Sequence, residues 1–337
     1  MPALKARSGG FFVQAEPATF PMVNLALKRF MRRGRLPRKV RRAPAPSFTV
    51  RLPDGRVIAI EEYGDPAGPV VLYFHGWPAS RLEAGLIADL PVRLLALDRP
   101  GYGRSSPLPG RSLLDWPRDV ADVADRLGLG RFHVAGLSGG APYAVACAYA
   151  LPHRVKSVAL VCPVPPANGL PPRASGVGHL YRLGRHPVLA HRLFSVLRPL
   201  LRRRIITPRT LVGSSLPAAD RECLDRQTLS GLARVWREGI GRSIQGALSD
   251  AQIYGSDWNI PLGNVTVPVD LWYGSEDSLI PPHALTPFEA MPGLRLHIVA
   301  GEGHYSLAIR HAARILRQLT QQPREASSEV CDGGLLG

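Results

Sequence analysis

The amino-acid sequence predicts an α/β fold in which a mostly parallel sheet carries helices on both faces. Between residues 71 and 163, strand-like apolar runs alternate with segments of helical texture, an alternation that is typical of parallel sheets. The alternation stops at Pro163, and strand-like runs return only at residues 267–274. A helical insert therefore interrupts the sheet, and we expect this insert to form a cap.

Each element follows from its own local signal. Two β-rich runs flank Pro53-Asp54-Gly55, a turn signal that predicts a hairpin. Ser112 or Asp115 is suited to cap a helix over 112–127, with Pro117 in its first turn. The other predicted strands span residues 71–76, 92–101, 131–138, 154–163, 267–274 and 294–301, and the other predicted helices span 79–90, 139–150 and 306–320.

The composition divides the chain into a core, an insert and two tails. We predict a sheet-bearing core over residues 47–162 and 263–321, a helical cap over 163–262 and a loose tail over 322–337. Residues 1–46 are interpreted as a basic, poorly ordered arm. The alternatives for this arm are a transit peptide, a helix in weak contact with an anionic membrane surface, and a segment upstream of the true start codon.

The net charge of +16 is unevenly distributed along the chain. Residues 1–48 hold 11 Lys or Arg and one acid, whereas residues 49–162 hold 12 basic and 11 acidic side chains. This distribution argues against a uniformly basic nucleic-acid-binding domain, so we expect no nucleic-acid partner. The insert is also basic, and its run Arg202-Arg203-Arg204 is either a solvated face or a surface that attracts an anionic substrate.

The cysteines and the apolar segments bear on the compartment. The four cysteines are scattered without CxxC spacing, so neither a disulfide framework nor a zinc site is predicted. Cys147 and Cys162 lie in apolar segments, where we expect buried thiols. No stretch reaches the roughly 18 consecutive apolar residues that a membrane span needs. We therefore predict a cytoplasmic protein without a bound metal.

One glycine-rich stretch, Gly136-Leu137-Ser138-Gly139-Gly140, lies where a strand should pass into a helix. A serine at such a tight turn exposes its hydroxyl, and flanking side chains larger than glycine would collide with the strand and the helix. The Gly139 N–H lies at a helix N-terminus, where the dipole and an unpaired donor favour a developing negative charge. Ser138 is therefore the candidate nucleophile, and Gly139 is a candidate oxyanion donor.

A serine nucleophile needs a base, and the base needs a carboxylate that orients it. Of the ten histidines, His304 follows a strand-like run, and loops at the carboxyl ends of strands collect the chemistry of α/β sites. Asp277 follows the strand over 267–274 in a Gly-x-x-Asp-x-x-x-Pro spacing. We therefore expect His304 to act as the base and Asp277, rather than its neighbour Glu276, to orient it.

A second oxyanion donor is expected in the loop after an early strand. His75-Gly76-Trp77 follows the apolar run in this position, and the Trp77 N–H is the candidate donor. We expect the Trp77 indole to form a wall of the acyl pocket, with His75 and Gly76 also in the substrate-binding loop.

The candidate nucleophile, acid and base occur in the chain order Ser138, Asp277, His304. In this order and in these motifs the chain resembles the α/β-hydrolase superfamily, in its lidded branch of bacterial esterases and related hydrolases. A turn that starts at Asp98 and reads D-x-P-G-x-G-x-S adds to a resemblance that covers residues 48–320. The resemblance implies an eight-stranded, mostly parallel sheet with a helical cap over the site. Related dehalogenases and epoxide hydrolases carry Asp in place of Ser138, which argues against those activities.

The predicted function is that of a serine hydrolase acting on a small ester-like substrate. His304 would take the proton of Ser138, which would attack the carbonyl carbon, and water would later release the acyl group. This chemistry needs no cofactor. Carboxylesterase, lipase, lactonase, C–C bond hydrolase, aminopeptidase and perhydrolase activities all stay open. The alternative from a different class is a ligand-binding or signalling protein on the same scaffold.

Overall fold

The computed structural model of the chain describes residues 47–87, 90–167, 176–205, 207–208 and 216–321. All of them belong to one compact unit that begins at Ser47. The basic arm and the C-terminal tail predicted from the sequence lie outside the described residues, as does Cys331.

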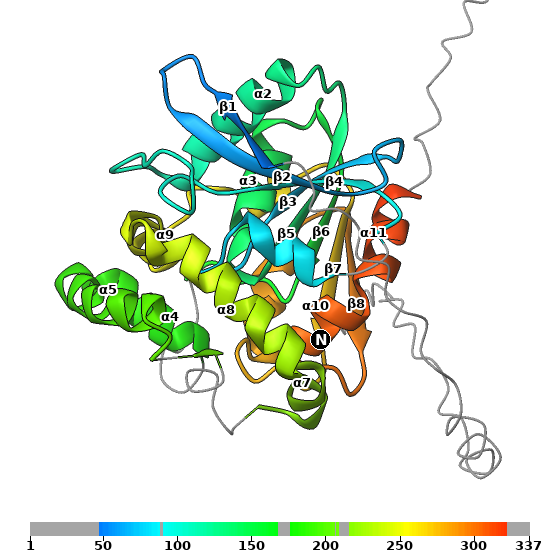
Figure 1. Cartoon of the computed structure of the whole chain (residues 1–337). Helices are drawn as coiled ribbons and strands as arrows, with labels where there is room; N and C mark the ends of the chain where they lie inside the picture. Colours follow the sequence, from blue (N-terminus) through cyan, green and yellow to red (C-terminus); the bar gives the residue numbers. More distant parts are fainter. Residues whose placement is uncertain (1–46, 88–89, 168–175, 206, 209–215, 322–337) are drawn as a thin grey trace, which may run out of the picture. The chain divides into compact units, whose positions relative to one another are not determined.

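An eight-stranded sheet forms the centre of this unit (Figure 1), with the strand order β1-β2-β4-β3-β5-β6-β7-β8. β1 and β2 form the predicted hairpin and β2 is also antiparallel to β4, whereas all other neighbours are parallel. The predicted eight-stranded, mostly parallel sheet is confirmed. Its strands are β1 Ser47–Arg51, β2 Val57–Gly64, β3 Val70–Phe74, β4 Arg93–Leu97, β5 Phe132–Leu137, β6 Val155–Val161, β7 Val269–Gly274 and β8 Leu294–Val299.

Helices connect the parallel strands and make up much of the described chain between β6 and β7. Those of the sheet layers are α2 Trp116–Arg126, α3 Ala141–Ala150, α10 His304–Arg310 and α11 Ala312–Thr320. Those between β6 and β7 are α4 Gly176–Arg185, α5 Pro187–Arg202, α7 Ala218–Cys223, α8 Arg226–Gly241 and α9 Gln245–Tyr254. Short 3₁₀ helices span Arg81–Leu86, Leu113–Asp115, Ser138–Gly140, Leu262–Asn264 and Pro282–Ala290.

Two predicted helices differ from those observed. In the described part of the segment 79–90, the helix is the 3₁₀ helix Arg81–Leu86, which ends before Ile87 because Ile87 adopts an extended conformation. The terminal helix expected over 306–320 is two helices, since His311 at φ −103° and ψ 1° leaves helical geometry between α10 and α11. The first of these helices also starts earlier than expected, so His304 begins α10 instead of lying in a loop ahead of it.

Side chains of each strand alternate between the two faces of the sheet. In β3, Leu72 and Phe74 pack into one apolar core, to which α2 and α3 contribute. Val71 and Tyr73 enter a second core on the other face, to which α11 contributes. Helices therefore cover both faces, as predicted, and burial on both faces explains why the central strands are continuous apolar runs.

The helix α8 packs directly on the loop that follows β3. A Cβ atom on Gly239 of α8 would lie 2.1 Å from the carbonyl oxygen of Ala79, so this close approach requires glycine. The Ser80 hydroxyl donates a hydrogen bond to the Val235 carbonyl at 3.0 Å, and the Arg81 guanidinium pairs with Glu238 at 2.8 Å. These contacts bind the helical insert to the loop in which we expect an oxyanion donor.

A buried carboxylate on α9 makes a second connection between the insert and the core. Asp250 is fully buried and accepts hydrogen bonds from Arg99 at 2.7 Å, from Tyr102 at 2.8 Å and from Arg111. Burial opposes ionisation, but the two guanidinium groups hold the pKa of Asp250 below its ordinary value. The charge is therefore retained and fully paired, as buried charges must be.

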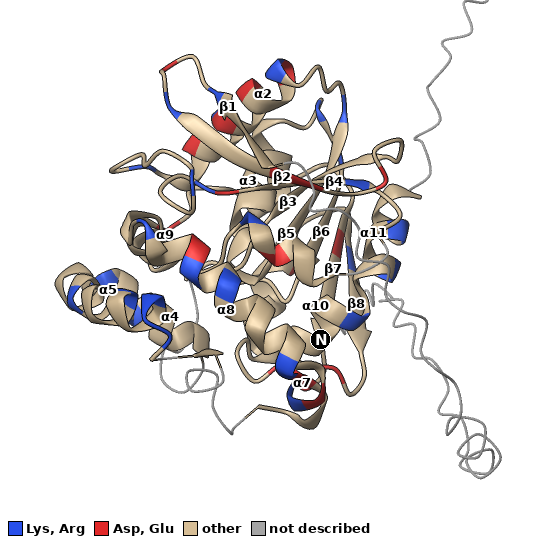
Figure 2. Cartoon of the chain, in the orientation of Figure 1, with Lys and Arg blue, Asp and Glu red and all other residues tan. Residues whose placement is uncertain are grey.

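Two thiols are buried in the core, and basic side chains lie on the helices of the insert. Cys147 and Cys162 are buried, as expected. Basic side chains lie along α4, α5 and α8 (Figure 2), and Arg202 ends α5. Within the described ranges, no helix is long and apolar enough to cross a membrane.

Replacement of Asp250 tests how strongly this connection stabilises the fold. We expect Asp250→Ala to lower the free energy of unfolding by about 3–5 kcal/mol, because it leaves two buried guanidinium groups without a counter-charge. Urea unfolding monitored by circular dichroism measures this loss. Glu222→Ala, which removes a carboxylate that is 73% exposed and weakly paired with Arg310, is the control and should change stability by less than about 1 kcal/mol. An equal effect of the two substitutions would contradict the assignment.

Candidate active site

Ser138 lies at the junction of β5 and α3 in a left-handed backbone conformation, with φ at 51°. Such a conformation costs a non-glycine residue on the order of 1–3 kcal/mol. The flanking glycines make the turn possible. A Cβ atom on Gly136 would lie 2.6 Å from the carbonyl oxygen of Gly140, and a Cβ atom on Gly140 would lie 2.0 Å from that of Phe74. The collisions expected from the sequence are therefore the reason for glycine at these positions.

His304 and Asp277 come together from the ends of two neighbouring strands. The Nδ1 atom of His304 lies 2.8 Å from Oδ2 of Asp277, and both side chains are buried. The other carboxylate oxygen accepts hydrogen bonds from the N–H groups of Leu279 at 2.8 Å and Ile280 at 3.0 Å. Asp277 therefore has a fixed orientation, whereas Glu276 beside it is exposed.

Burial and pairing act in opposite directions on the ionisation of this pair. Burial alone would lower the pKa of His304, but the charge and hydrogen bond of Asp277 raise it above its ordinary value. Burial would raise the pKa of Asp277, but His304 and the two backbone donors lower it. The carboxylate is therefore ionised and stabilises a protonated imidazole.

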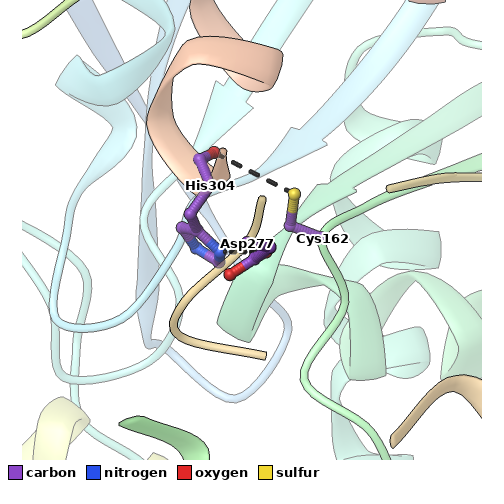
Figure 3. A group of neighbouring side chains, drawn as sticks. All are labelled: Cys162, Asp277 and His304. Carbon is purple, nitrogen blue, oxygen red and sulfur yellow. Dashed lines mark hydrogen bonds and ion pairs between the residues drawn. The ribbon is translucent and has the colours of Figure 1, made fainter. Parts of the chain in front are cut away.

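Cys162 approaches the same pair (Figure 3), and its Sγ atom lies 4.0 Å from the backbone oxygen of His304. These three residues have ligand atoms close enough together to hold a metal ion. However, burial and the nearby Asp277 carboxylate raise the pKa of Cys162 well above its ordinary value, and a thiol binds metals as the thiolate. The cluster is therefore suited to an ionised carboxylate–imidazole pair with a neutral thiol beside it.

Ser138 and His304 line one pocket at the carboxyl ends of the strands. Trp77 and Gly76 from the loop after β3 line it as well, and α8 contributes Leu232 and Trp236. The other lining residues are Tyr73, Glu83, Leu86, Ile87, Leu137, Leu279, Tyr305, Ala308 and Ile309. Arg202, Arg203 and Arg204 are not among them. The interpretation of this run as a surface that attracts an anionic substrate stays a prediction.

The backbone of Trp77 lies beside the serine turn. A Cβ atom on Gly139 would lie 3.2 Å from the Trp77 nitrogen, which places the two expected oxyanion donors in adjacent segments. The Trp77 indole donates a hydrogen bond to the Ala247 carbonyl of α9 at 2.9 Å and packs edge-on against Phe194 of α5. Trp77 therefore lines the pocket and also attaches its loop to the insert.

His75 lies elsewhere than the sequence suggested. It is fully buried, absent from the pocket lining, and packed against the Tyr102 ring at 4.8 Å between ring centroids. Its Nδ1 atom is 2.8 Å from the Gly76 carbonyl oxygen, and its Nε2 atom accepts the Arg99 N–H at 3.4 Å. The His75 ring therefore does not line the pocket, and the residues that do line it give no support to the expectation that His75 binds substrate.

Asp220 of α7 was not singled out from the sequence, yet it holds the beginning of α10. Its carboxylate accepts hydrogen bonds from the backbone N–H groups of His304 at 3.1 Å, Tyr305 at 3.0 Å and Ser306 at 2.8 Å. A carboxylate at this end satisfies donors that a helix leaves unpaired. The insert therefore fixes the position of His304, and no sequence signal marks a contact that spans 84 residues.

Tyr254 of α9 holds the serine turn in place through a hydrogen bond. Its hydroxyl donates a hydrogen bond to the Gly139 carbonyl at 2.6 Å and lies 3.0 Å from Asp250. Glu83, which lines the pocket, was also not singled out from the sequence. Both residues lie in segments with ordinary helical patterns, so their roles depend on contacts that only the folded chain makes.

Comparison with known proteins places this chain in a family. The sequence matches the α/β-hydrolase fold family over residues 69–309, and the chain belongs to this family. It is 25% identical to a 2-hydroxy-6-oxononadienedioate/2-hydroxy-6-oxononatrienedioate hydrolase of Burkholderia vietnamiensis over 252 residues, which are 73% of this chain and 81% of that protein. The chain is thus a hydrolase of the α/β-hydrolase family.

Two further similarities are shorter or more distant. A non-heme chloroperoxidase of Streptomyces lividans is 35% identical over 124 residues, which are 35% of this chain and 45% of the chloroperoxidase, so the chain spans less than half of that relative. A thermophilic esterase from Thermogutta terrifontis has a similar structure, with a TM-score of 0.62, 19% identity, and coverage of 82% of this chain and 97% of the esterase. This structural likeness confirms the fold.

Titration of the histidines tests the pairing of His304 with Asp277. We expect the His304 imidazole to titrate above its ordinary pKa of 6.5, whereas His133, which is buried near Lys156 and Arg131, has its pKa lowered to about 4. Asp277→Asn should lower the pKa of His304, because it removes the carboxylate charge, and should leave that of His133 unchanged. NMR titration of the imidazole nitrogens measures both groups. An unchanged His304 in the variant would show that the ion pair does not form.

Proposed function

We propose that the protein is a serine hydrolase that cleaves small ester-like substrates through an acyl-enzyme intermediate. The observation that carries this proposal is the pocket shared by Ser138, at its strained turn, and His304, paired with Asp277. A nucleophile, a base and a group that orients the base are the parts that acyl transfer requires.

In the proposed reaction, the unprotonated Nε2 atom of His304 accepts the proton of Ser138 as Oγ attacks the carbonyl carbon. The N–H groups of Gly139 and Trp77 stabilise the oxyanion, and each such donor contributes about 3 kcal/mol in hydrolases of this kind. His304 then gives its proton to the leaving group. Water, activated by the same imidazole, releases the acyl group and restores Ser138.

The electrostatics of the pair support these roles. Nδ1 of His304 is held by Asp277, so Nε2 is the nitrogen left to face the serine. Because the pKa of His304 is raised, the imidazole becomes a free base only as the pH rises through that raised pKa. We therefore propose that activity increases with pH over this range, and that the ionised Asp277 stabilises the imidazolium formed in the transition state.

Labelling with a fluorophosphonate probe tests the nucleophile. We expect Ser138→Ala to abolish labelling and ester turnover, and Asp277→Asn to reduce the rate of turnover on the order of 10⁴-fold. Ser278→Ala is the matched control, because Ser278 is an exposed serine beside Asp277, and this variant should label like the wild type. A folded wild-type protein that neither labels nor cleaves esters, but binds a small ligand tightly, would replace the proposal with the ligand-binding alternative.

A further inference from the structure

Glu83 places a carboxylate inside the pocket that contains Ser138 and His304. The residue lies in the 3₁₀ helix Arg81–Leu86, and its exposed fraction is only 9%. Its Oε2 atom accepts hydrogen bonds from the Tyr73 hydroxyl at 2.8 Å and from the Gly76 N–H at 2.7 Å. One oxygen therefore fixes the side chain against the loop that carries Trp77.

The other oxygen of Glu83 is left for the pocket. Oε1 accepts no hydrogen bond from the described residues, and it lies 3.1 Å from the position that a Cβ atom on Gly76 would occupy. An alanine at position 76 would crowd this oxygen, whereas the glycine leaves it open. Glu83 is thus a nine-tenths buried acid with a free acceptor beside the proposed oxyanion site.

The surroundings of Glu83 compensate its charge only in part, because the two cationic groups that act on it, Arg99 and His304, are each paired with another acid. No Lys or Arg is found among the described residues that line the pocket, and most of its wall is apolar, including Leu86, Leu232 and Trp236. The guanidinium of Arg99 is nearby, but it is already paired with Asp250 at 2.7 Å. Burial raises the pKa of Glu83 above its ordinary value, although the hydrogen bonds from Gly76 and Tyr73 and the charges of Arg99 and His304 oppose that effect.

A buried carboxylate with an unpaired oxygen in an apolar pocket is costly, and a bound cation with N–H donors removes this cost. A neutral donor could hydrogen-bond to this oxygen but would leave the negative charge uncompensated, and an anionic group would be repelled. We propose that Glu83 binds a protonated amine of the substrate, so that the enzyme prefers esters whose acyl part carries an amino group. This inference rests on the proposed function, since it assigns the substrate class of that same site.

Three methyl esters that differ in one group test the inference: those of alanine, lactic acid and isobutyric acid, which place an ammonium, a hydroxyl or a methyl at the same carbon. Turnover is followed by acid release at a pH of about 7, where most of the amine is protonated. We expect Glu83→Gln to lower the ratio of kcat/KM for the alanine ester to that for the isobutyrate ester on the order of 10- to 100-fold. Intrinsic reactivities cancel, because the same ratio is compared in two proteins.

Glu276→Gln is the matched control for this experiment. It also removes one carboxylate near the site, but Glu276 is exposed and does not line the pocket, so the ratio should stay within about twofold of wild type. A role of Glu83 that is only structural would lower kcat/KM for all three esters equally and leave the ratio unchanged. That result, or a preference for the lactate ester that Glu83→Gln abolishes, would overturn the assignment of an amine.

A measurement on the wild-type protein covers the case in which Glu83→Gln does not fold. Isobutylammonium should protect Ser138 from the fluorophosphonate probe at lower concentrations than isobutanol does, and equal protection by the two would overturn the inference.

The failure of the inference about Glu83 can be distinguished from the failure of the proposed function. If Ser138 labels and the isobutyrate ester is cleaved without any preference for the amine, only the inference about Glu83 fails. If Ser138 does not label and no ester is cleaved, both proposals fail.

Discussion

The ion pairing of Asp250 is the interaction on which the arrangement of the site depends. Its buried carboxylate joins Arg99 and Arg111 of the core to Tyr254 of the insert. Arg99 in turn donates a hydrogen bond to the carbonyl of His75, and Tyr254 donates one to that of Gly139. A buried charge is tolerated only when it is fully paired, so Asp250 requires these partners to stay in place. Through them, the serine turn and the loop after β3 are both linked to one helix of the insert, α9.

A second carboxylate of the insert, that of Asp220, fixes the segment that carries His304. Asp220 holds three N–H groups at the beginning of α10, where His304 is located. The insert thus contributes one acid to the nucleophile side and another to the histidine side. Its helices are part of the scaffold that positions the reacting groups, in addition to forming the pocket wall through Leu232 and Trp236.

Among the described residues, the buried acids Asp250, Asp277, Asp220 and Glu83 contact the segments that form the site, and the first three have all their charge or hydrogen-bonding needs met by partners within the protein. Asp250 is paired with arginines, Asp277 with His304, and Asp220 with backbone donors. Glu83 has only two neutral donors, and its remaining oxygen is open to the pocket. This difference in compensation is the physical basis for assigning the first three to the architecture and chemistry of the site and Glu83 to the substrate.

The sequence by itself determined the strand and helix alternation, the serine turn and the order of Ser138, Asp277 and His304, because these features depend on local backbone geometry and on residues placed just after strands. It did not indicate that the His75 ring is buried against Tyr102 and does not line the pocket, since the position of a side chain depends on what packs around the loop. The roles of Asp220, Asp250 and Glu83 were decided only by the tertiary structure. Their partners come from other elements or loops, and an acid on a helix has no sequence feature that distinguishes a buried ion pair from a solvated face.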